Sequence, residues 1–424
     1  MKEIFKKLII DSQQKEYNNI SFRDYKIPLK TKKIVSLIGV RRSGKTFILY
    51  DLINKLRKTE NRENIIFINF EDDRLFPLEL KNLDSLIEGY FELFPQKRKE
   101  RIFLFLDEVQ NVKGWELFVR RIYDNLNIQI YITGSSSKLL SSEIATSLRG
   151  RTITYEIFPF SFKEYLIYKN INIDFYSSNS ISFIKNAFNK YLFEGGFAET
   201  FDEEPDIQLK ILKNYLDLII YKDLIDRYGI KNHGLLKNLI KYLTVNMGTL
   251  FSVNKMYNDF RSMGFKFSRN TLYEYLSILQ DTYAFFSVPV FSNSIKSEQR
   301  NPQKTYSIDN GFKQLFNISF TNDYSKLYEN LVFLQLRRKT DEIFYFKQKQ
   351  EIDFYIPANL QKLINVSFDI NDKETYNREI NSLNEGMEYF NLKNSLLITS
   401  EIEDVVKIED KTINILPLWK WLLT

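Results

Sequence analysis

The residues with the clearest chemical meaning form the segment 39–46, whose spacing is G-x-x-x-x-G-K-[ST]. Its glycines permit a tight turn in which consecutive backbone N–H groups point at phosphate oxygens, and a helix after it would add its positive end. The lysine places a charge on the β- and γ-phosphates, and the hydroxyl that follows it can ligate Mg²⁺. The segment therefore predicts a loop that binds ATP with Mg²⁺; the alternative is a glycine turn with a solvated lysine. The predicted nucleotide-binding residues are Gly39, Val40, Arg41, Arg42, Ser43, Gly44, Lys45 and Thr46.

Two consecutive acids, Asp107 and Glu108, follow the apolar run 102–106. At the end of a strand, Asp107 can hold the water shell of a magnesium ion. Glu108 beside it can take a proton from the attacking water as a general base. Acids are common at strand ends, so this interpretation depends on the phosphate loop that precedes them. We predict Thr46 and Asp107 as metal-binding residues, and Lys45 and Glu108 as catalytic residues.

A third polar group follows the apolar run 128–133. Ser135 is predicted to bind the γ-phosphate or the lytic water, and the alternative is a helix N-cap, a position that serine prefers. Arg149 and Arg151 come next along the chain. Either arginine can reach a γ-phosphate, in its own subunit or in a neighbouring one. We take Arg151 as a further candidate catalytic residue, against the alternative of a surface arginine.

The composition excludes several classes of chemistry. The 424-residue chain has no Cys and a single His, His233. It therefore has no disulfides, cysteine nucleophiles, iron–sulfur clusters or thiolate zinc sites, and any Ser-His-Asp triad would depend on His233. No apolar stretch reaches the length of a membrane span, and the apolar run near the amino terminus is too short for a secretory signal. We expect a soluble, cytoplasmic protein.

The elements that must position these residues follow the order of an α/β fold. Continuous apolar runs of this kind are typical of strands buried on both faces of a parallel sheet. The expected strands are 34–38, 65–70, 102–106 and 128–133. The expected crossover helices are 45–58, 79–93 and 115–125. The sequence thus predicts a P-loop domain, a parallel sheet flanked by helices, over residues 1–160.

The pattern changes after residue 160. It is helical to about residue 247, and three short helices then precede a β-ribbon. The helices are expected near 235–246, 253–263 and 268–280, and the strands near 283–290 and 303–308. The rest of the chain returns to mixed α/β. Its helices are expected at 325–339 and 374–391, and its strands at 343–347, 351–356 and 362–368.

In this order, the motifs resemble the AAA-type P-loop ATPases of bacteria and archaea that carry a C-terminal restriction-endonuclease-like domain. The resemblance spans nearly the whole chain. The segments that carry it are 39–46, 106–110, 133–136, 150–151, 158–162, 194–197, 306–311, 328–330 and 351–354. It implies an AAA-type ATPase domain over 1–160, a helical lid or linker over 161–232, a winged helix over 233–312 and a restriction-endonuclease-like domain over 313–424.

The implied winged helix suggests DNA as a partner of residues 233–312. Within 231–304, ten Lys and Arg stand against four Asp and Glu, a net charge of +6. A helix that begins after Ser268 would enter a major groove. Lys296, Arg300 and Lys304 would lie near phosphates in the wing. The alternative is a winged helix that contacts a protein partner and carries a solvated basic face.

The implied nuclease-like domain lacks part of its chemistry. A nuclease of the restriction-endonuclease type needs a helix Glu, a strand Asp and then an acid-x-Lys on the next strand. Glu329 and Asp353 occupy the first two places, but Asn365 and Ser367 replace the acid and the lysine. Without that ligand and that cation, metal-dependent cleavage should be crippled. Residues 369–411 also carry a net charge of −6, which disfavours a polyanion. We therefore predict a degenerate, non-cleaving domain.

These observations predict a Mg²⁺-dependent ATPase coupled to a DNA-binding C-terminal half. Two other functions stay open at this point. One is an ATP-gated switch that contacts proteins and has no nucleic acid role. The other is an ATP-regulated nuclease.

Overall fold

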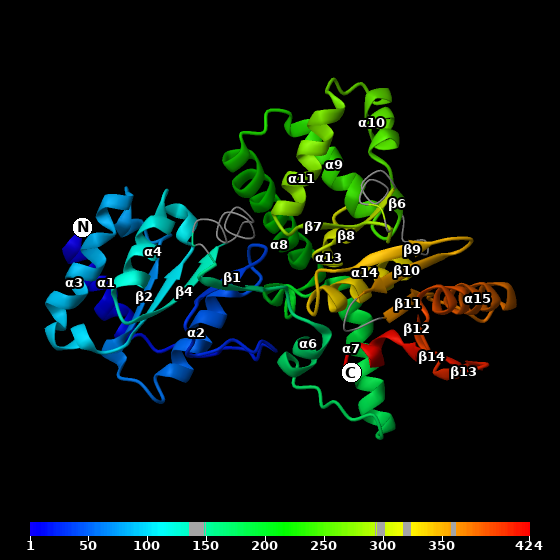
Figure 1. Cartoon of the computed structure of the whole chain (residues 1–424), viewed down its shortest axis with the longest axis horizontal. Coiled ribbons are helices and arrows are strands. Elements are labelled where there is room, and N and C mark those ends of the chain that lie inside the picture. The colour runs from blue at the N-terminus through cyan, green and yellow to red at the C-terminus, as the bar shows by residue number, and fades with distance from the viewer. Residues whose placement is uncertain (135–147, 149, 293, 295–301, 317–323, 358–361) are drawn as a thin grey trace. The chain divides into compact units, whose positions relative to one another are not determined.

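The computed structural model describes residues 1–134, 148, 150–292, 294, 302–316, 324–357 and 362–424 (Figure 1). These residues form two compact units, Met1–Phe158 and Pro159–Thr424. Each unit is described by itself below. The expected division of the second unit at residues 232 and 312 stays a prediction.

The first unit is built on a five-stranded, all-parallel sheet with the order β2-β3-β4-β1-β5. The strands are β1 (Ile34–Ile38), β2 (Ile65–Asn69), β3 (Ile102–Asp107), β4 (Ile128–Gly134) and β5 (Thr152–Glu156). The three central strands, β1, β3 and β4, are buried along their whole length. Burial of every residue requires cover on both faces, as expected from their continuous apolar sequences.

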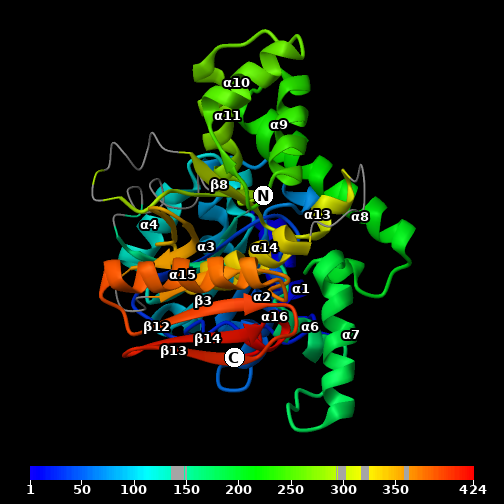
Figure 2. The same cartoon turned by 90° about the vertical axis from the view of Figure 1, so that its right-hand side faces the viewer.

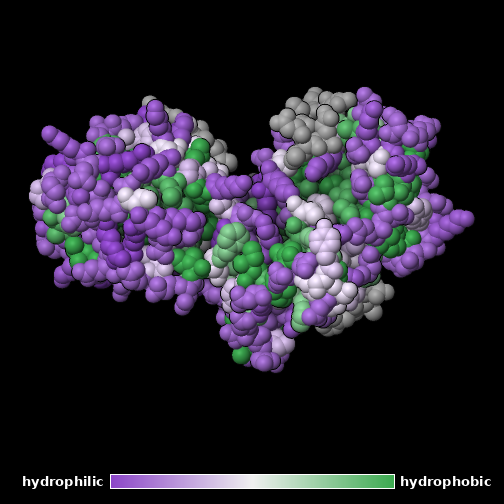
Figure 3. All heavy atoms as spheres, turned by 90° about the horizontal axis from the view of Figure 1, so that it is seen from below, coloured by the Kyte–Doolittle hydropathy of each residue, from purple (hydrophilic) through white to green (hydrophobic). Residues whose placement is uncertain are grey.

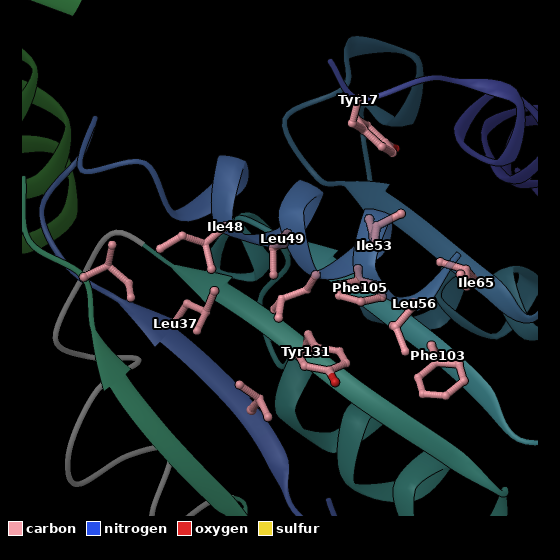
Figure 4. Close-up of a cluster of buried hydrophobic side chains, with 13 residues drawn as sticks. Tyr17, Leu37, Ile48, Leu49, Ile53, Leu56, Ile65, Phe103, Phe105 and Tyr131 are labelled. Carbon is pink, nitrogen blue, oxygen red and sulfur yellow. The ribbon is translucent and has the colours of Figure 1, made fainter. Parts of the chain in front are cut away.

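Helices flank this sheet (Figure 1). They are α1 (Lys2–Gln14), α2 (Lys45–Leu56), α3 (Asp84–Leu93) and α4 (Trp115–Asn125). Figure 4 shows Ile48, Leu49 and Ile53 of α2 beside side chains of the sheet, among them Phe105 and Tyr131. The rings of Phe105 and Tyr131 stack on neighbouring strands with centroids 4.4 Å apart. This core fixes the start of α2, and with it the loop 39–46, against the end of β1.

Two features of the first unit differ from the sequence expectation. Strand β5 was not predicted, because it is an edge strand with no fully buried residue and has no continuous apolar run. Helix α3 begins at Asp84 rather than at residue 79, and a short 3₁₀ helix, Leu80–Asn82, precedes it. The other strands and helices whose bounds were predicted in this unit lie within two residues of those bounds at each end.

The second unit begins with a helical region. Its helices are α6 (Phe162–Tyr168), α7 (Ser178–Glu194) and α8 (Pro205–Leu218), and a π-helical segment, Ile219–Asp226, continues α8. Ser161 and Glu164 form a capping box that fixes the start of α6. The carboxylate of the buried Asp309 accepts hydrogen bonds from the backbone N–H of Gly196 at 2.6 Å and of Gly311 at 2.8 Å, so it joins the end of α7 to a later segment.

Three helices and a small antiparallel sheet follow. In chain order they are α9 (His233–Val245), β6 (Leu250–Phe251), α10 (Val253–Ser262), α11 (Arg269–Asp281), β7 (Phe285–Val288) and β8 (Gln303–Ser307). The sheet order is β6-β8-β7. Helices α9, α10 and α11 lie together in both views (Figures 1 and 2). Ser252 and Ser268 cap α10 and α11 by accepting a backbone hydrogen bond in each first turn.

One expectation for this region is wrong. Lys304, which was expected to lie near phosphates in a wing, is on β8 with its side chain only 2% exposed. Its ammonium pairs with carboxylates inside the unit. Lys296 and Arg300 lie outside the described residues.

The carboxyl-terminal part contains a six-stranded mixed sheet with the order β13-β14-β12-β11-β10-β9. The strands are β9 (Phe344–Lys347), β10 (Glu351–Ile356), β11 (Lys362–Val366), β12 (Asn394–Thr399), β13 (Asp404–Ile408) and β14 (Lys411–Pro417). Helix α15 (Lys373–Phe390) packs Leu383 and Met387 on this sheet, and α14 (Tyr324–Arg337) lies beside β11 and β8. The sequence predicted these helices and β9 to β11, and did not define β12 to β14.

Among the residues that the structure describes, no helix is long and apolar enough to cross a bilayer. On the face shown in Figure 3, hydrophobic side chains are scattered among hydrophilic ones.

Candidate functional site

The loop 39–46 lies between β1 and α2, at the carboxyl end of the parallel sheet. Gly44 is the N-cap of α2 with φ +94°, and Gly39 has φ +144°. A Cβ at Gly39 would lie 2.1 Å from the Ile157 carbonyl oxygen, and one at Gly44 would lie 2.7 Å from Nη1 of Arg23. The glycines therefore allow close packing by neighbouring segments as well as the turn itself.

The side chains of this loop point to a phosphate ligand. Lys45 is buried, and its Nζ donates to the carbonyl oxygens of Gly39 at 3.1 Å and Val40 at 3.0 Å. The hydroxyl of Ser43 is buried and has no hydrogen-bond partner within the described part of the chain. Arg42 holds φ +65°, a backbone conformation that is costly for a residue with a side chain. A buried ammonium, an unpartnered hydroxyl and the amino end of α2 fit the oxygens of a nucleotide phosphate.

Asp107 lies at the end of β3 and connects this loop to two neighbouring strands. Thr46 Oγ1 donates to Asp107 Oδ2 at 2.8 Å, and the Thr133 hydroxyl donates to Oδ1. Burial raises the pKa of Asp107 to about 6, although the hydrogen bonds from Thr133 and Thr46 oppose this rise. A buried carboxylate beside a threonine hydroxyl supplies the hard oxygen ligands that Mg²⁺ prefers, so these residues fit that ion.

Glu108 follows in a left-handed conformation with φ +56°. Its backbone N–H donates to Thr133 Oγ1 at 3.0 Å, and the Gln110 side chain donates to its Oε2. The side chain is 9% exposed, so it is shielded but not sealed from solvent. Strain in the backbone of a residue beside a phosphate loop is typical of a functional position. The structure thus brings Lys45, Thr46, Asp107 and Glu108 together, as predicted.

Thr133 and Arg23 belong to this site and were not predicted as site residues. Thr133 contacts both acids, and the available signal was its place at the end of a strand next to β3. Arg23 donates through Nη1 to the Ser43 carbonyl at 2.8 Å and through Nη2 to the Phe158 carbonyl at 2.6 Å. It links the phosphate loop to the last residue of the first unit. No spacing relation in the sequence points to Arg23, because its contacts exist only in the folded chain.

Two other predicted residues, Arg151 and Arg41, pair with acids outside this constellation. Arg151 precedes β5, at the opposite end of the sheet from the loop, and pairs with Asp124 at 3.0 and 3.1 Å. A catalytic role in its own chain is therefore not supported, and a role in a neighbouring copy stays a prediction. Arg41 pairs with Glu71 at 3.3 Å. Ser135 and Arg149 lie outside the described residues.

The buried charge of Asp107 leads to a prediction about stability. The folded protein binds the Asp107 proton more tightly than the unfolded chain does, because burial raises the pKa of Asp107 from its usual 3.8 to about 6. The ionised carboxylate therefore destabilises the folded state above pH 6, by on the order of 3 kcal/mol. We expect Asp107→Asn to raise the Tm by about 5–10 °C at pH 7.5. The gain should shrink as the pH falls toward 4.

Thermal unfolding across this pH range, without nucleotide or metal, measures the effect. Asp72→Asn is the matched control, because the hydrogen bond from Arg74 lowers the pKa of Asp72 and its charge is stabilising. That variant should show no gain in Tm at pH 7.5. An Asp107→Asn protein with the wild-type Tm at pH 7.5 would contradict the conclusion that the buried charge of Asp107 destabilises the folded state.

Comparisons with known proteins are consistent with this geometry. A family model described as an AAA domain matches residues 31–166, and a domain of unknown function matches residues 185–320. The chain is 38% identical over 437 residues to the uncharacterised protein MJ1544 of Methanocaldococcus jannaschii, covering 100% of this chain and 96% of that protein. It is 31% identical over 351 residues to an uncharacterised protein of Haemophilus influenzae, covering 81% and 85%.

Two solved structures are similar to parts of this chain. The RuvB Holliday junction branch migration motor of Thermotoga maritima is 17% identical, with a TM-score of 0.27, over 63% of this chain and 88% of that chain. The AMPPCP-bound DnaA of Aquifex aeolicus is also 17% identical, with a TM-score of 0.26, over 49% and 68%. The sheet order, the loop between β1 and α2 and the AAA domain match identify the fold of the first unit as that of a P-loop NTPase.

Proposed function

The chain belongs to the family that includes protein MJ1544 of Methanocaldococcus jannaschii and carries an AAA domain, and from this premise we propose that it is a Mg²⁺-dependent ATPase. The observation that carries the proposal is one constellation at the carboxyl edge of the sheet. There the buried Lys45 and the half-buried Thr46 of the loop lie with Asp107 and Glu108 at the end of β3, and Thr133 contacts both acids.

The proposed reaction is attack of water on the γ-phosphorus of ATP, with cleavage of the bond to the β–γ bridging oxygen. Lys45 would exchange its two carbonyl partners for phosphate oxygens, and Ser43 would gain the partner that its hydroxyl lacks among the described residues. Thr46 and Asp107 would hold Mg²⁺, which supplies neutralisation of phosphate charge when it is bound. Glu108 would accept the proton of the attacking water. Thr133 would fix the orientation of both acids.

Equilibrium titration of the whole chain with a non-hydrolysable ATP analogue tests this proposal at the binding step. We expect saturable binding at one site per chain that strengthens when Mg²⁺ is present. A protein that shows no saturable binding at millimolar analogue, with or without Mg²⁺, would rule the proposal out.

We also propose that residues 233–312 act as a winged helix that binds duplex DNA. The order α9, β6, α10, α11, β7 and β8, with the sheet order β6-β8-β7, supports this interpretation. Helix α11 begins at an exposed Ser268-Arg269-Asn270 turn, where a recognition helix would meet base edges. The Arg269 guanidinium lies over the Tyr257 ring at 5.1 Å, which limits its rotamers without removing its charge.

The exposed charges nearby have the sign that DNA attracts. Four cations on α10, on α11 and between them are exposed, namely Lys255, Arg261, Lys266 and Arg269. Lys304 does not add to them because it is buried. The proposed contacts with DNA phosphates therefore lie at the start of α11 and along α10.

We expect Arg269→Ala to weaken duplex DNA binding by about tenfold or more, since one lost phosphate or base contact is worth roughly 1–3 kcal/mol. It should also flatten the dependence of affinity on salt concentration. Fluorescence anisotropy with a labelled duplex at several salt concentrations measures both effects.

Lys393→Ala is a matched control for this experiment, because Lys393 is highly exposed but lies in the carboxyl-terminal part, within the acidic segment 369–411. Its affinity should equal that of the wild type. A wild-type protein that does not bind duplex even at low salt would instead favour the alternative of a switch that contacts proteins.

A further inference from the structure

The carboxylates that resemble a nuclease metal site surround a lysine ammonium. Lys304 Nζ lies 3.0 Å from Glu329 Oε1, 2.9 Å from Glu351 Oε1 and 2.7 Å from Asp353 Oδ1. These residues come from three elements, β8, α14 and β10. The lysine side chain is 2% exposed, so water cannot solvate this charge, and the carboxylates must do so.

Two further donors inside the protein contact the carboxylates of this cluster. The Tyr306 hydroxyl donates to Glu329 Oε1 at 2.7 Å, and the Val366 backbone N–H donates to Asp353 Oδ2 at 2.8 Å. Both Oδ atoms of Asp353 are therefore used, one by an amide and one by the ammonium of Lys304. Burial alone would lower the pKa of Lys304, but the charges of Asp353, Glu329 and Glu351 raise it well above its usual value.

Asn365, which stands where a nuclease would carry an acid, also has an internal role. Its Nδ2 donates to Glu379 Oε2 at 2.7 Å and to Ser382 Oγ at 2.8 Å, and its Oδ1 accepts from the Asp353 backbone N–H at 3.2 Å. Asn365 thus joins α15 to β10 by hydrogen bonds to one carboxylate, one hydroxyl and one backbone N–H. With the Lys304 ammonium between its carboxylates, the cluster does not fit a divalent metal.

We propose that the Lys304 ammonium is the resident cation of this cluster and occupies the position that a divalent metal would otherwise take. A second cation there would meet a full positive charge at close range in a buried site. Lys304 thus closes the site to metal-dependent cleavage and ties β8 of the small sheet to α14 and β10. The small sheet and the six-stranded sheet are joined by a buried charge cluster, not only by apolar packing.

The test measures Mn²⁺ binding to the whole chain by electron paramagnetic resonance, and measures the thermal stability of each variant by its Tm. The wild type and Asp353→Asn should bind the same number of Mn²⁺ ions, and Mn²⁺ should not cleave plasmid DNA in either. Lys304→Ala leaves buried carboxylates without their cation, so its Tm should fall by roughly 10 °C. It should also gain one bound Mn²⁺ per chain and recover much of the lost Tm when millimolar Mn²⁺ is added.

Adding Asp353→Asn to Lys304→Ala should remove the extra Mn²⁺ and the recovery, while Lys393→Ala should behave as the wild type throughout. If Lys304→Ala does not fold without metal, it can be refolded in Mn²⁺ and its bound Mn²⁺ counted. The comparison of the wild type with Asp353→Asn tests the proposal independently of that variant. Two results overturn the proposal: a wild-type Mn²⁺ site that Asp353→Asn abolishes, or a Lys304→Ala protein that gains no Mn²⁺.

Discussion

Replacing Lys45 by alanine should abolish ATP hydrolysis, with kcat/KM at least about 10³-fold below the wild type. The physical reason is that Lys45 places a buried ammonium among the carbonyl oxygens of the loop, where charge on transferred phosphoryl oxygens would be stabilised in a site of low dielectric. Removal of a single such electrostatic contact costs about 10²- to 10³-fold in other enzymes, and Lys45 would also contribute to ATP binding. A phosphate-release assay over a range of ATP concentrations measures the change.

The control for this variant lies on the same helix. Lys55→Ala removes an exposed lysine that pairs with Asp51 at 2.6 Å on the surface of α2. Exposed pairs of this kind contribute little to stability, so its turnover should match the wild type. If Lys45→Ala retains a tenth or more of the wild-type kcat/KM, the loop is not the site of phosphoryl transfer.

Glu108→Gln should separate ATP binding from ATP hydrolysis. We expect kcat to fall by about 10²- to 10⁴-fold, the range typical of a lost general base, while the Kd for ATP changes by no more than a few-fold. The amide keeps the shape of the side chain but cannot take a proton from the attacking water. The backbone N–H of residue 108 would still donate to Thr133 Oγ1, so the position of the loop should be retained.

Two measurements are needed for this variant: Kd by calorimetry and kcat by phosphate release. Glu88→Gln serves as the control, because Glu88 is an exposed acid on α3 that pairs with Lys2. Hydrolysis at the wild-type rate by Glu108→Gln would show that another group activates the water. Loss of ATP binding instead of turnover would assign Glu108 to the binding of metal or nucleotide.

The parts of the first unit that the sequence predicts well are those whose burial is uniform. Strands β1, β3 and β4 are covered on both faces, and uninterrupted apolar runs are a direct consequence of that. The position of the phosphate loop was equally well defined, because the motif needs a strand before it and a helix after it. Strand β5 was missed since an edge strand carries mixed residues and gains its place from pairing with β1.

The site residues that were not predicted from the sequence make contacts with residues far away along the chain. Arg23 meets Ser43 and Phe158 only because the segment before β1 folds back over the loop, and nothing in the local spacing encodes that contact. Thr133 gains its contacts to both acids from the adjacency of β3 and β4. Such long-range contacts depend on sheet order, which a list of expected elements does not provide.

Lys304 shows the limit of counting charges along a segment. Its place in a basic stretch suggested a solvated phosphate contact, whereas β8 turns its side chain toward Glu329, Glu351 and Asp353. The resemblance to a nuclease placed Glu329 and Asp353 in one site, and in the structure both carboxylates contact the Lys304 ammonium. No pattern in the sequence predicts Lys304 beside these acids, because the residues that surround a buried acid depend on the tertiary structure.

A single-turnover measurement of γ-phosphate cleavage, with the protein in excess over radiolabelled ATP, tests most directly whether this chain hydrolyses ATP at the loop 39–46. We predict that the wild type and Lys55→Ala cleave the bound ATP when Mg²⁺ is present and leave it intact when the metal is chelated. Lys45→Ala should show no cleavage, and Glu108→Gln should hold intact ATP. Wild-type protein that fails to cleave bound ATP in Mg²⁺, or Lys45→Ala that cleaves it at the wild-type rate, would contradict the account.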